Sequence, residues 1–267
     1  MLEVRNLCVQ LKQQDRQRTL VEGISFSLGE DQCLGILGES GSGKSVTCSA
    51  INGLLGEHFS VSGSVRLRQK ELLTLPANER RQLRGSDIAM IMQSPMTAFN
   101  PLFTIGNQAV ETIRQHHTVD KKAALELICN AMSRVNLKDP QSLLKLYPHE
   151  LSGGMLQRIM VSFALVLEPK IIIADEPTTA IDYISQREVV RELQLVRETF
   201  GTSFIFVSHD LSLISHIADD VLVMNNGQMV DYGSAQSVFS HPESEHTRYL
   251  IDMRMKLINR FQSVMGS

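Results

Sequence analysis

Apolar and polar positions alternate along much of the 267-residue chain in patterns that separate strands from helices. Residues 2–11 and 20–28 alternate with a period of two, as strands with one buried face do. The polar, charged stretch at 13–18 predicts a turn between them, and a further short strand is expected at 62–67. The first part of the chain therefore predicts a small antiparallel sheet.

A second group of strands is marked by continuous apolar runs, which are typical of strands buried on both faces of a parallel sheet. These runs cover residues 33–37, 87–92, 170–174 and 203–207. Helical patterns lie between and after them, at residues 46–55, 78–83, 104–150, 151–167, 184–198, 211–217 and 235–262. A hairpin is expected at 221–232, around an Asn-Asn-Gly turn. Strands that alternate with helices predict an α/β fold.

Composition narrows the class of protein. Hydrophobic residues make up 43% of the chain, and the net charge of −3 implies no general affinity for nucleic acid. The four cysteines form no C-x-x-C pair and are expected to be reduced thiols of a cytosolic protein. Charges interrupt the first five residues, so no signal peptide is expected, and no apolar run approaches the ~20 residues of a membrane helix. Any membrane role is therefore expected to come through a partner.

The stretch Gly38-Glu39-Ser40-Gly41-Ser42-Gly43-Lys44-Ser45 fits the pattern G-x-x-x-x-G-K-[ST] of a phosphate-binding loop, with Val46 following it. It joins a predicted buried strand to a predicted helix, which is the context that such a loop requires. Glycines allow the backbone N–H groups to converge on phosphate oxygens, and the helix N-terminus adds partial positive charge. Lys44 is expected to reach the β- and γ-phosphates, and the Ser45 hydroxyl to bind Mg²⁺. The alternative is an ordinary Gly/Ser turn.

Two adjacent carboxylates, Asp175 and Glu176, follow the apolar strand at 170–174. Asp175 is expected to hold Mg²⁺, which prefers oxygen ligands, directly or through water. Glu176 is then placed to orient or deprotonate an attacking water. The alternative is that both residues cap the next helix.

Taken in order, the motifs resemble those of the ATP-binding cassette ATPases over nearly the whole chain. The motifs are Gly38–Ser45, Gln93 after a strand, Leu151-Ser152-Gly153-Gly154-Met155, Ile171–Glu176, Thr179-Ala180-Ile181-Asp182 and His209. The Ser-Gly-Gly signature is the most specific of them. The resemblance implies an α/β phosphate-loop ATPase core with an antiparallel β subdomain and an inserted α-helical signature subdomain.

The resemblance also implies residue roles and the cofactors ATP and Mg²⁺. Two cassettes would close head to tail, so that Ser152, Gly153 and Gly154 contact the γ-phosphate held by the opposite cassette. Gln93 would sense Mg²⁺, which Ser45 and Asp175 also bind, and the attacking water. His209 would contact the γ-phosphate and hold Glu176 in line, and Asp182 would support the dimer seam. Without the other motifs, His209 would be an ordinary strand-end histidine, Gln93 a turn residue and Asp182 a helix N-cap.

The domain boundaries expected from this resemblance divide one ATPase domain over residues 1–262. The ATP-binding core with its β subdomain covers 1–95 and 168–240, the helical insertion covers 96–167, and a C-terminal helical extension covers 241–262.

Several segments resemble the peptide and nickel importer branch of the family: Phe99-Asn100-Pro101-Leu102, Tyr147–Met155, and the end from His241-Pro242 to Leu250. Within that branch, Gly154–Arg158 and Ser45–Cys48 look closer to the nickel subunit than to the peptide subunits. The resemblance implies a peripheral ATPase on the cytoplasmic face of the inner membrane that drives import of nickel or a nickel chelate, or alternatively of di- or oligopeptides. The implied partners are two transmembrane permease subunits, a second and different cassette, and an extracytoplasmic substrate-binding protein, with no nucleic acid. A soluble cassette acting on DNA or ribosomes is disfavoured, because no basic groove or long coiled coil is evident.

Two residues depart from the family pattern. Met155 stands where the family most often has Gln in the signature. Since Ser152 and the glycine backbone carry the expected phosphate contact, activity should survive this change. No aromatic residue precedes Phe26, so Leu11 or a neighbour is expected to pack against adenine, with weaker selectivity for the base.

Overall fold

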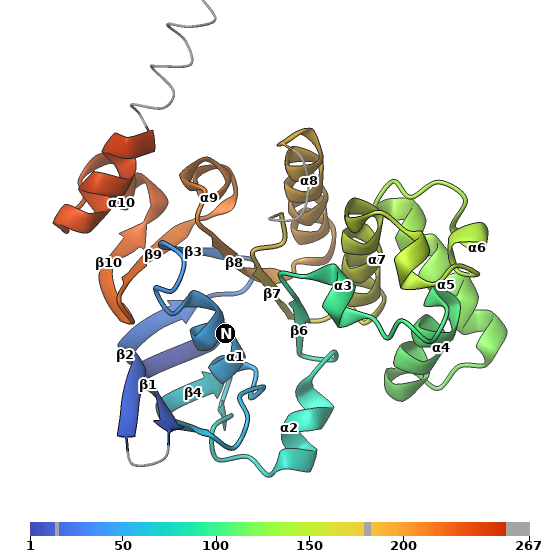
Figure 1. The fold of residues 1–267 in the computed structure, drawn as a ribbon, viewed down its shortest axis with the longest axis horizontal. Helices are drawn as coiled ribbons and strands as arrows, with labels where there is room; N and C mark the ends of the chain where they lie inside the picture. The colour runs from blue at the N-terminus through green and yellow to red at the C-terminus, as the bar shows by residue number, and fades with distance from the viewer. Residues whose placement is uncertain (14–15, 179–182, 255–267) are drawn as a thin grey trace, which may run out of the picture. The chain divides into compact units, whose positions relative to one another are not determined.

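The computed structural model describes residues 1–13, 16–178 and 183–254, and the chain groups into two compact units. Unit 1 comprises Met1–Leu75 and Ile205–Ser267, and unit 2 comprises Pro76–Phe204. Strand β8 (Ser203–Ser208) runs across this division in the sequence. Figure 1 labels the helices and strands of both units.

Unit 1 is built from a sheet with short helices. Its elements are β1 (Leu2–Gln13), β2 (Arg16–Leu28), β3 (Cys33–Leu37), α1 (Lys44–Ile51), β4 (Phe59–Leu67), β5 (Lys70–Glu71), α9 (Leu211–Ile217), β9 (Asp220–Asn225), β10 (Gln228–Ser234) and α10 (Ala235–Ser240). The strand order in this unit is β5-β4-β1-β2-β10-β9-β3-β8.

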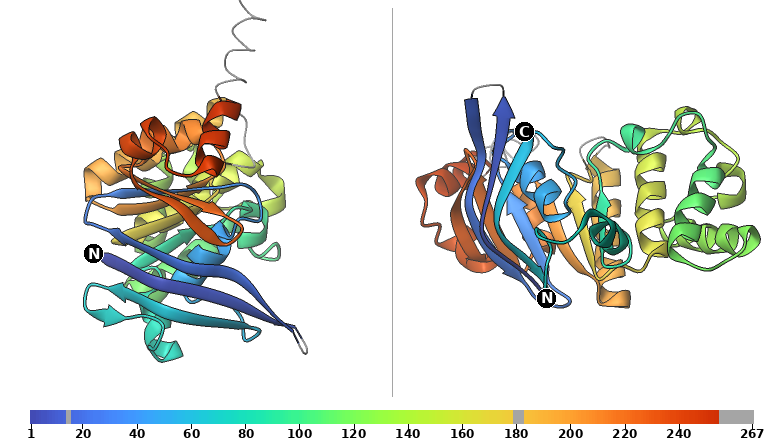
Figure 2. Two further views of the ribbon diagram at one scale, coloured as in Figure 1. Left: turned by 90° about the vertical axis from the view of Figure 1, so that its left-hand side faces the viewer. Right: turned by 90° about the horizontal axis from the view of Figure 1, so that it is seen from below.

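The antiparallel sheet expected in the first part of the chain is confirmed. Strand β1 pairs antiparallel with β2 on one side and with β4 on the other, and β4 pairs with β5. Figure 2 shows β1, β2 and β4, drawn in blue to teal, side by side. Further along the sheet, β3 is parallel to β9, and all five β3 residues are buried. The continuous apolar run at 33–37 is therefore a parallel strand with no exposed face, as the pattern predicts.

The hairpin between β1 and β2 is longer than the alternation predicts. The turn was expected over 13–18, but β2 begins at Arg16, and Leu11 pairs with Arg18 and Lys12 with Gln17. The exposed end of a hairpin has no core face to fill, so polar residues extend it through backbone pairing and the alternation of side chains disappears there.

Unit 2 holds two parallel strands and most of the long helices. Its elements are α2 (Ala77–Leu83), β6 (Ile88–Ile91), α3 (Pro95–Ala98), α4 (Ile105–His116), α5 (Lys121–Arg134), α6 (Pro140–Leu143), the 3₁₀ turn η1 (Pro148–Glu150), α7 (Gly153–Val166), β7 (Ile171–Asp175) and α8 (Tyr183–Phe200). Strands β6 and β7 pair in parallel, with Ile88 opposite Ile171.

The apolar stripes expected in the helical stretch of unit 2 face its interior. Ala124, Ile128, Ala131 and Met132 of α5 are all buried. Helix α7 packs against α4 and α5, and Phe163 of α7 meets Phe99 edge to face, with ring centroids 5.5 Å apart. These contacts fix the position of α7 within the helical part of unit 2.

Some details differ from the sequence pattern. Pro95 is the first residue of α3, a position where its missing N–H costs nothing. The helical extension expected from residue 235 is interrupted at 241–244, next to Pro242, and resumes at 245–254. No helix among the described residues is both long and apolar enough to span a membrane.

Candidate functional site

The phosphate loop of unit 1 has the strand–loop–helix setting that its motif requires. Buried strand β3 ends at Leu37 and α1 begins at Lys44. Gly41 and Gly43 have φ values of +82° and +103°, a left-handed region that strains other residues. A Cβ added to Gly38 would lie 2.4 Å from the carbonyl oxygen of Met224 in β9. Glycine is therefore required both for the turn and for close packing on β9.

The side chain of Lys44 turns back into this loop. It is buried, with 4% of its surface exposed. Its Nζ donates hydrogen bonds of 2.8 Å to the carbonyl oxygens of Gly38 and Glu39. The loop carbonyls thus hold the ammonium group in the concavity where the backbone N–H groups converge, as a phosphate-binding lysine requires.

Ser42 offers a further polar group at the same loop. Its side chain is 5% exposed, and its Oγ has no hydrogen-bond partner among the described residues. Its backbone carbonyl accepts from Gly227 N at 3.0 Å, which fixes the loop. A buried hydroxyl without a partner costs free energy, and a phosphate oxygen would satisfy it. The loop therefore fits a nucleotide phosphate.

In unit 2, the two sequence-predicted carboxylates occupy the end of β7. Asp175 is the last residue of the strand and is 5% exposed, and Glu176 follows with 9% exposed. Glu176 has φ of +45°, in the left-handed region that non-glycine residues rarely occupy. Such backbone strain is concentrated at functional sites, so the conformation itself marks this position.

Gln93 and Glu176 meet in the structure. Gln93 lies just beyond β6, and its Nε2 donates to Glu176 Oε2 at 3.0 Å. Because β6 and β7 are parallel neighbours, their carboxyl ends bring together residues that lie 83 positions apart in the sequence. The amide therefore fixes the direction of the carboxylate that the sequence identifies as the candidate base.

The signature residues form the start of α7. Ser152 is the N-cap, and its Oγ accepts from Met155 N at 3.3 Å. Gly153 and Gly154 are the first two helical residues, and Ser152 is exposed. Their N–H groups lie in the first turn, which has no intrahelical acceptors. This end of α7 is suited to meet an anion from outside the chain.

His209 follows β8 in unit 1 and is exposed. The next residue, Asp210, is the N-cap of α9, and its side chain accepts from Ser212 N at 2.8 Å. Motif reasoning singled out His209 but not this carboxylate, and the Ser208-His209-Asp210 stretch held no stronger signal for it. Asp182, expected at a dimer seam, lies outside the described residues, as do Thr179, Ala180 and Ile181.

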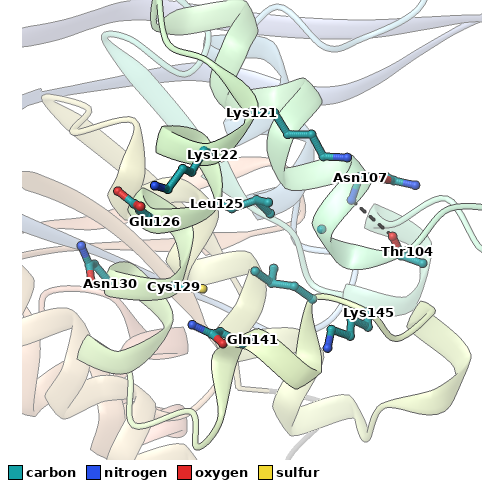
Figure 3. A pocket seen from close by; sticks show the side chains of 12 residues that line it. Thr104, Asn107, Lys121, Lys122, Leu125, Glu126, Cys129, Asn130, Gln141 and Lys145 are labelled. Atoms are coloured by element: carbon teal, nitrogen blue, oxygen red, sulfur yellow. Dashed lines mark hydrogen bonds between the residues drawn. The ribbon is translucent and has the colours of Figure 1, made fainter.

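A pocket of about 850 Å³ lies within the helical part of unit 2, and Figure 3 shows it from close by. Leu125 and Cys129 of α5 and Leu144 next to α6 give it apolar surface, and Lys121 and Lys122 line it too. Burial raises the pKa of the Cys129 thiol, which keeps it neutral at pH 7. No sequence motif pointed to this pocket, because three helices that are separate in the sequence form it.

Comparisons with known proteins agree with this geometry. The sequence profile of the ABC transporter family matches residues 21–179. The metal-staphylopine import system ATP-binding protein CntD of Staphylococcus aureus is 44% identical over 246 residues, which cover 92% of this chain and 91% of that protein. The oligopeptide transport ATP-binding protein OppD of Haemophilus influenzae is 40% identical over 252 residues, which cover 94% of this chain and 78% of that protein.

A solved structure shares the fold. The dimeric, post-hydrolysis ATP-binding cassette MJ0796, bound to ADP and Pi, has a TM-score of 0.77 at 22% identity, and the match covers 88% of this chain and 99% of that chain. Together, the family match over residues 21–179 and the full-length relatives identify the chain as a member of the ABC transporter family, as one of its ATPase subunits.

Proposed function

We propose that this ATPase subunit drives a membrane importer for nickel or a nickel chelate. The observation that carries the proposal is the 44% identity, over nine-tenths of both chains, with an ATP-binding protein of a metal-staphylopine import system. A di- or oligopeptide importer is the second candidate, and the 40% identity with an oligopeptide transport ATP-binding protein supports it. Both candidate importers would hydrolyse ATP in the same way, so the ATPase mechanism does not depend on which substrate is imported.

Binding of ATP is assigned to the loop of unit 1. Residues 38–46 wrap the β- and γ-phosphates, and Lys44 supplies the positive charge. Its bonds to the carbonyls of Gly38 and Glu39 support this role, because they hold Nζ inside the loop. Ser42 gains a partner for its buried hydroxyl when phosphate binds. Ser45, Gln93 and Asp175 supply oxygen ligands for Mg²⁺, which neutralises phosphate charge when bound.

Hydrolysis is assigned to three residues. Glu176 accepts the proton of the attacking water at a carboxylate oxygen, and Gln93 orients that carboxylate and senses the state of the site. The 3.0 Å hydrogen bond between these two residues supports the pairing. His209 contacts the γ-phosphate and holds Glu176 and the water in line.

The working assembly is a head-to-tail pair of cassettes. The start of α7 contains Ser152, Gly153 and Gly154, and Ser152 is exposed. It supports a role across such an interface, because the N–H groups of the first turn have no acceptors within the helix. ATP then binds between the two cassettes, and its hydrolysis lets the pair of cassettes open. We assign the partner cassette to a different chain, and Asp182 to the seam between the two.

The helical insertion at 96–167 is proposed to hold a permease subunit at the cytoplasmic face of the inner membrane. The pocket in Figure 3 supports this, because apolar Leu125 and Leu144 lie among three lysines, Lys121, Lys122 and Lys145, and one carboxylate, Glu126. Lys121 and Lys122 open helix α5, where cations oppose the helix dipole, and the carboxylate of the N-cap residue Asp120 accepts from Ala123 N at 2.8 Å. A cytoplasmic helix with apolar and acidic residues would fit this charge. An external binding protein would deliver the cargo to the permeases.

The test is uptake of radiolabelled nickel by cells that carry the complete transporter, with Lys44→Ala compared with wild type. Lys138→Ala, on an exposed lysine that is not part of the phosphate loop, is the matched control. Loss of nickel uptake in Lys44→Ala alone would support the nickel motor. Unchanged nickel uptake, with loss of dipeptide accumulation instead, would assign the chain to a peptide importer.

A further inference from the structure

The C-terminal helix at 245–254 is fastened to β10 at its start. Asp231 of β10 is 7% exposed, and its carboxylate accepts from the backbone N–H groups of Glu243 and Ser244, both at 3.1 Å. It also accepts from the hydroxyl of Thr247. A buried carboxylate with three donors at a helix N-terminus is a strong anchor, because it satisfies otherwise open N–H groups and complements the helix dipole.

The last described residue of this helix reaches the loop that carries His209. Arg254 Nη2 lies 3.4 Å from Asp210 Oδ1, with side-chain exposures of 33% and 21%. The same Oδ1 accepts from Ser212 N at 2.8 Å, and the backbone N of Asp210 donates to Ser208 Oγ at 2.9 Å. Asp210 is therefore held from three directions, and His209 is its immediate neighbour.

Among the residues that the structure describes, Asp210 is the carboxylate that pairs with Arg254, and the buried Nε of Arg254 has no hydrogen-bond partner. The pair is partly shielded from solvent, so it is less screened than a surface ion pair. The anchor at Asp231 fixes the start of the same helix, which limits how far Arg254 can withdraw. The helix thus connects β10 to the residue that caps α9.

We propose that Arg254 is a positioning residue for His209. Its ion pair with Asp210 fixes the backbone on the C-terminal side of His209. This in turn fixes the position from which the imidazole contacts the γ-phosphate. The inference rests on the role of His209 in the proposed function. Since Arg254 acts through Asp210 and the phosphate loop carries ATP binding, its loss should lower kcat and leave KM for ATP unchanged.

The experiment measures phosphate release by the full chain, purified with its permease partners, in Arg254→Gln, Arg254→Lys and Asp210→Asn. Asparagine also serves as an N-cap, so Asp210→Asn removes the charge and keeps the cap on α9. We expect kcat to fall about three- to tenfold in Arg254→Gln and in Asp210→Asn, the loss of one partly shielded ion pair. Arg254→Lys should recover most of the loss, and the double variant Arg254→Gln/Asp210→Asn should be no worse than either single one.

Arg248→Gln is the matched control on the same helix, where Arg248 donates to the carbonyls of Pro242 and Glu243. It should keep wild-type kcat. If Arg248→Gln and Arg254→Gln lower kcat and the melting temperature equally, the helix only stabilises the unit and the inference is overturned. His209→Ala distinguishes failure of the proposed role of His209 from failure of the proposed role of Arg254. Turnover that survives in His209→Ala removes the proposed role of His209, whereas an inactive His209→Ala with a fully active Arg254→Gln overturns the inference about Arg254.

Discussion

Gln93 donates its side-chain amide to Glu176 Oε2 at 3.0 Å, between the ends of two parallel strands. The carboxylate is nearly buried and its backbone is left-handed, while the amide is exposed. The exposed side chain of Gln93 thus restrains the buried carboxylate that we propose as the base, so we expect a substitution at Gln93 to alter the geometry of Glu176.

Removal of the amide is the direct test of this relationship. Gln93→Ala should lower kcat by about 10- to 100-fold, the range expected for one hydrogen bond to a charged group. The affinity for ATP should change little, because the phosphate loop is intact. Phosphate release and nucleotide titration measure the two quantities. Gln82→Ala, on an exposed glutamine of α2, is the control, and an unchanged kcat in Gln93→Ala would contradict the restraint.

Glu176→Gln should remove turnover and keep ATP bound. Glutamine has nearly the same shape but accepts no proton, so kcat should fall about 10²–10⁴-fold. The variant should also accumulate as a closed cassette pair with ATP, seen by size-exclusion chromatography. Glu168→Gln is a close control, because Glu168 also has a positive φ, +46°, but is exposed. Near-normal hydrolysis in Glu176→Gln would remove Glu176 from its role.

Leu11 is the residue expected to meet adenine, and its neighbours in the sheet sharpen that prediction. Leu11 pairs with Arg18 of β2 and with Phe59 of β4, so one aromatic ring stands on the adjacent strand although none precedes Phe26 in the sequence. Leu11→Tyr should tighten ATP binding up to about tenfold, the value of one aromatic contact, and raise the preference for ATP over GTP. Leu54→Tyr, on an exposed leucine, is the control. Equal ATP affinity in wild type and Leu11→Tyr would count against adenine packing at this position.

The phosphate loop was predictable from the sequence because its chemistry is local. Residues 38–45 are consecutive, and strand and helix patterns flank them. Buried strands such as β7 were equally clear, because strands with no exposed face are continuously apolar. The ends of elements were less clear, as at Arg16, where backbone pairing extends the hairpin without any apolar signal.

Long-range contacts were out of reach of pattern and spacing. Gln93 was singled out by family resemblance and Glu176 by its place after an apolar strand, but their hydrogen bond depends on the pairing of β6 with β7. The pair of Asp210 and Arg254 had no sequence signal at all, since an arginine on a C-terminal helix is usually a solvated side chain. The role of Asp182 stays a prediction.

His116 should make the protein less stable in mild acid. His116 is exposed, but partial desolvation of its ring, with help from the nearby His117, lowers the pKa of His116 below its ordinary value. A Cβ on Gly85 would lie 2.8 Å from its ring, which shows how closely the imidazole packs. The unfolded chain therefore takes up the proton more readily than the folded one, and stability is lost as pH falls below about 6.5. Urea unfolding at neutral and acid pH measures this loss.

The matched variants for that experiment are His116→Gln and His241→Gln. Glutamine does not titrate, so His116→Gln should lose less stability between neutral and acid pH than wild type. His241→Gln is the control, because it makes the same substitution at another exposed histidine. An equal dependence in His116→Gln and wild type would show that the acid sensitivity arises elsewhere.

Charge reversal at the helical pocket tests the proposed permease surface. Lys121→Glu/Lys122→Glu should abolish co-purification with the permeases and cargo uptake, because the pocket would then repel acidic groups. The substitutions place carboxylates at the N-terminus of α5, where the helix dipole favours them, so the melting temperature should stay the same or rise. Lys70→Glu/Lys138→Glu makes the same change in net charge at exposed positions that do not line the pocket, and it should keep both properties. If the pocket variant and the control variant both still bind the permeases, the permease docks elsewhere on the insertion. If both variants lose binding, net charge and not the pocket governs assembly.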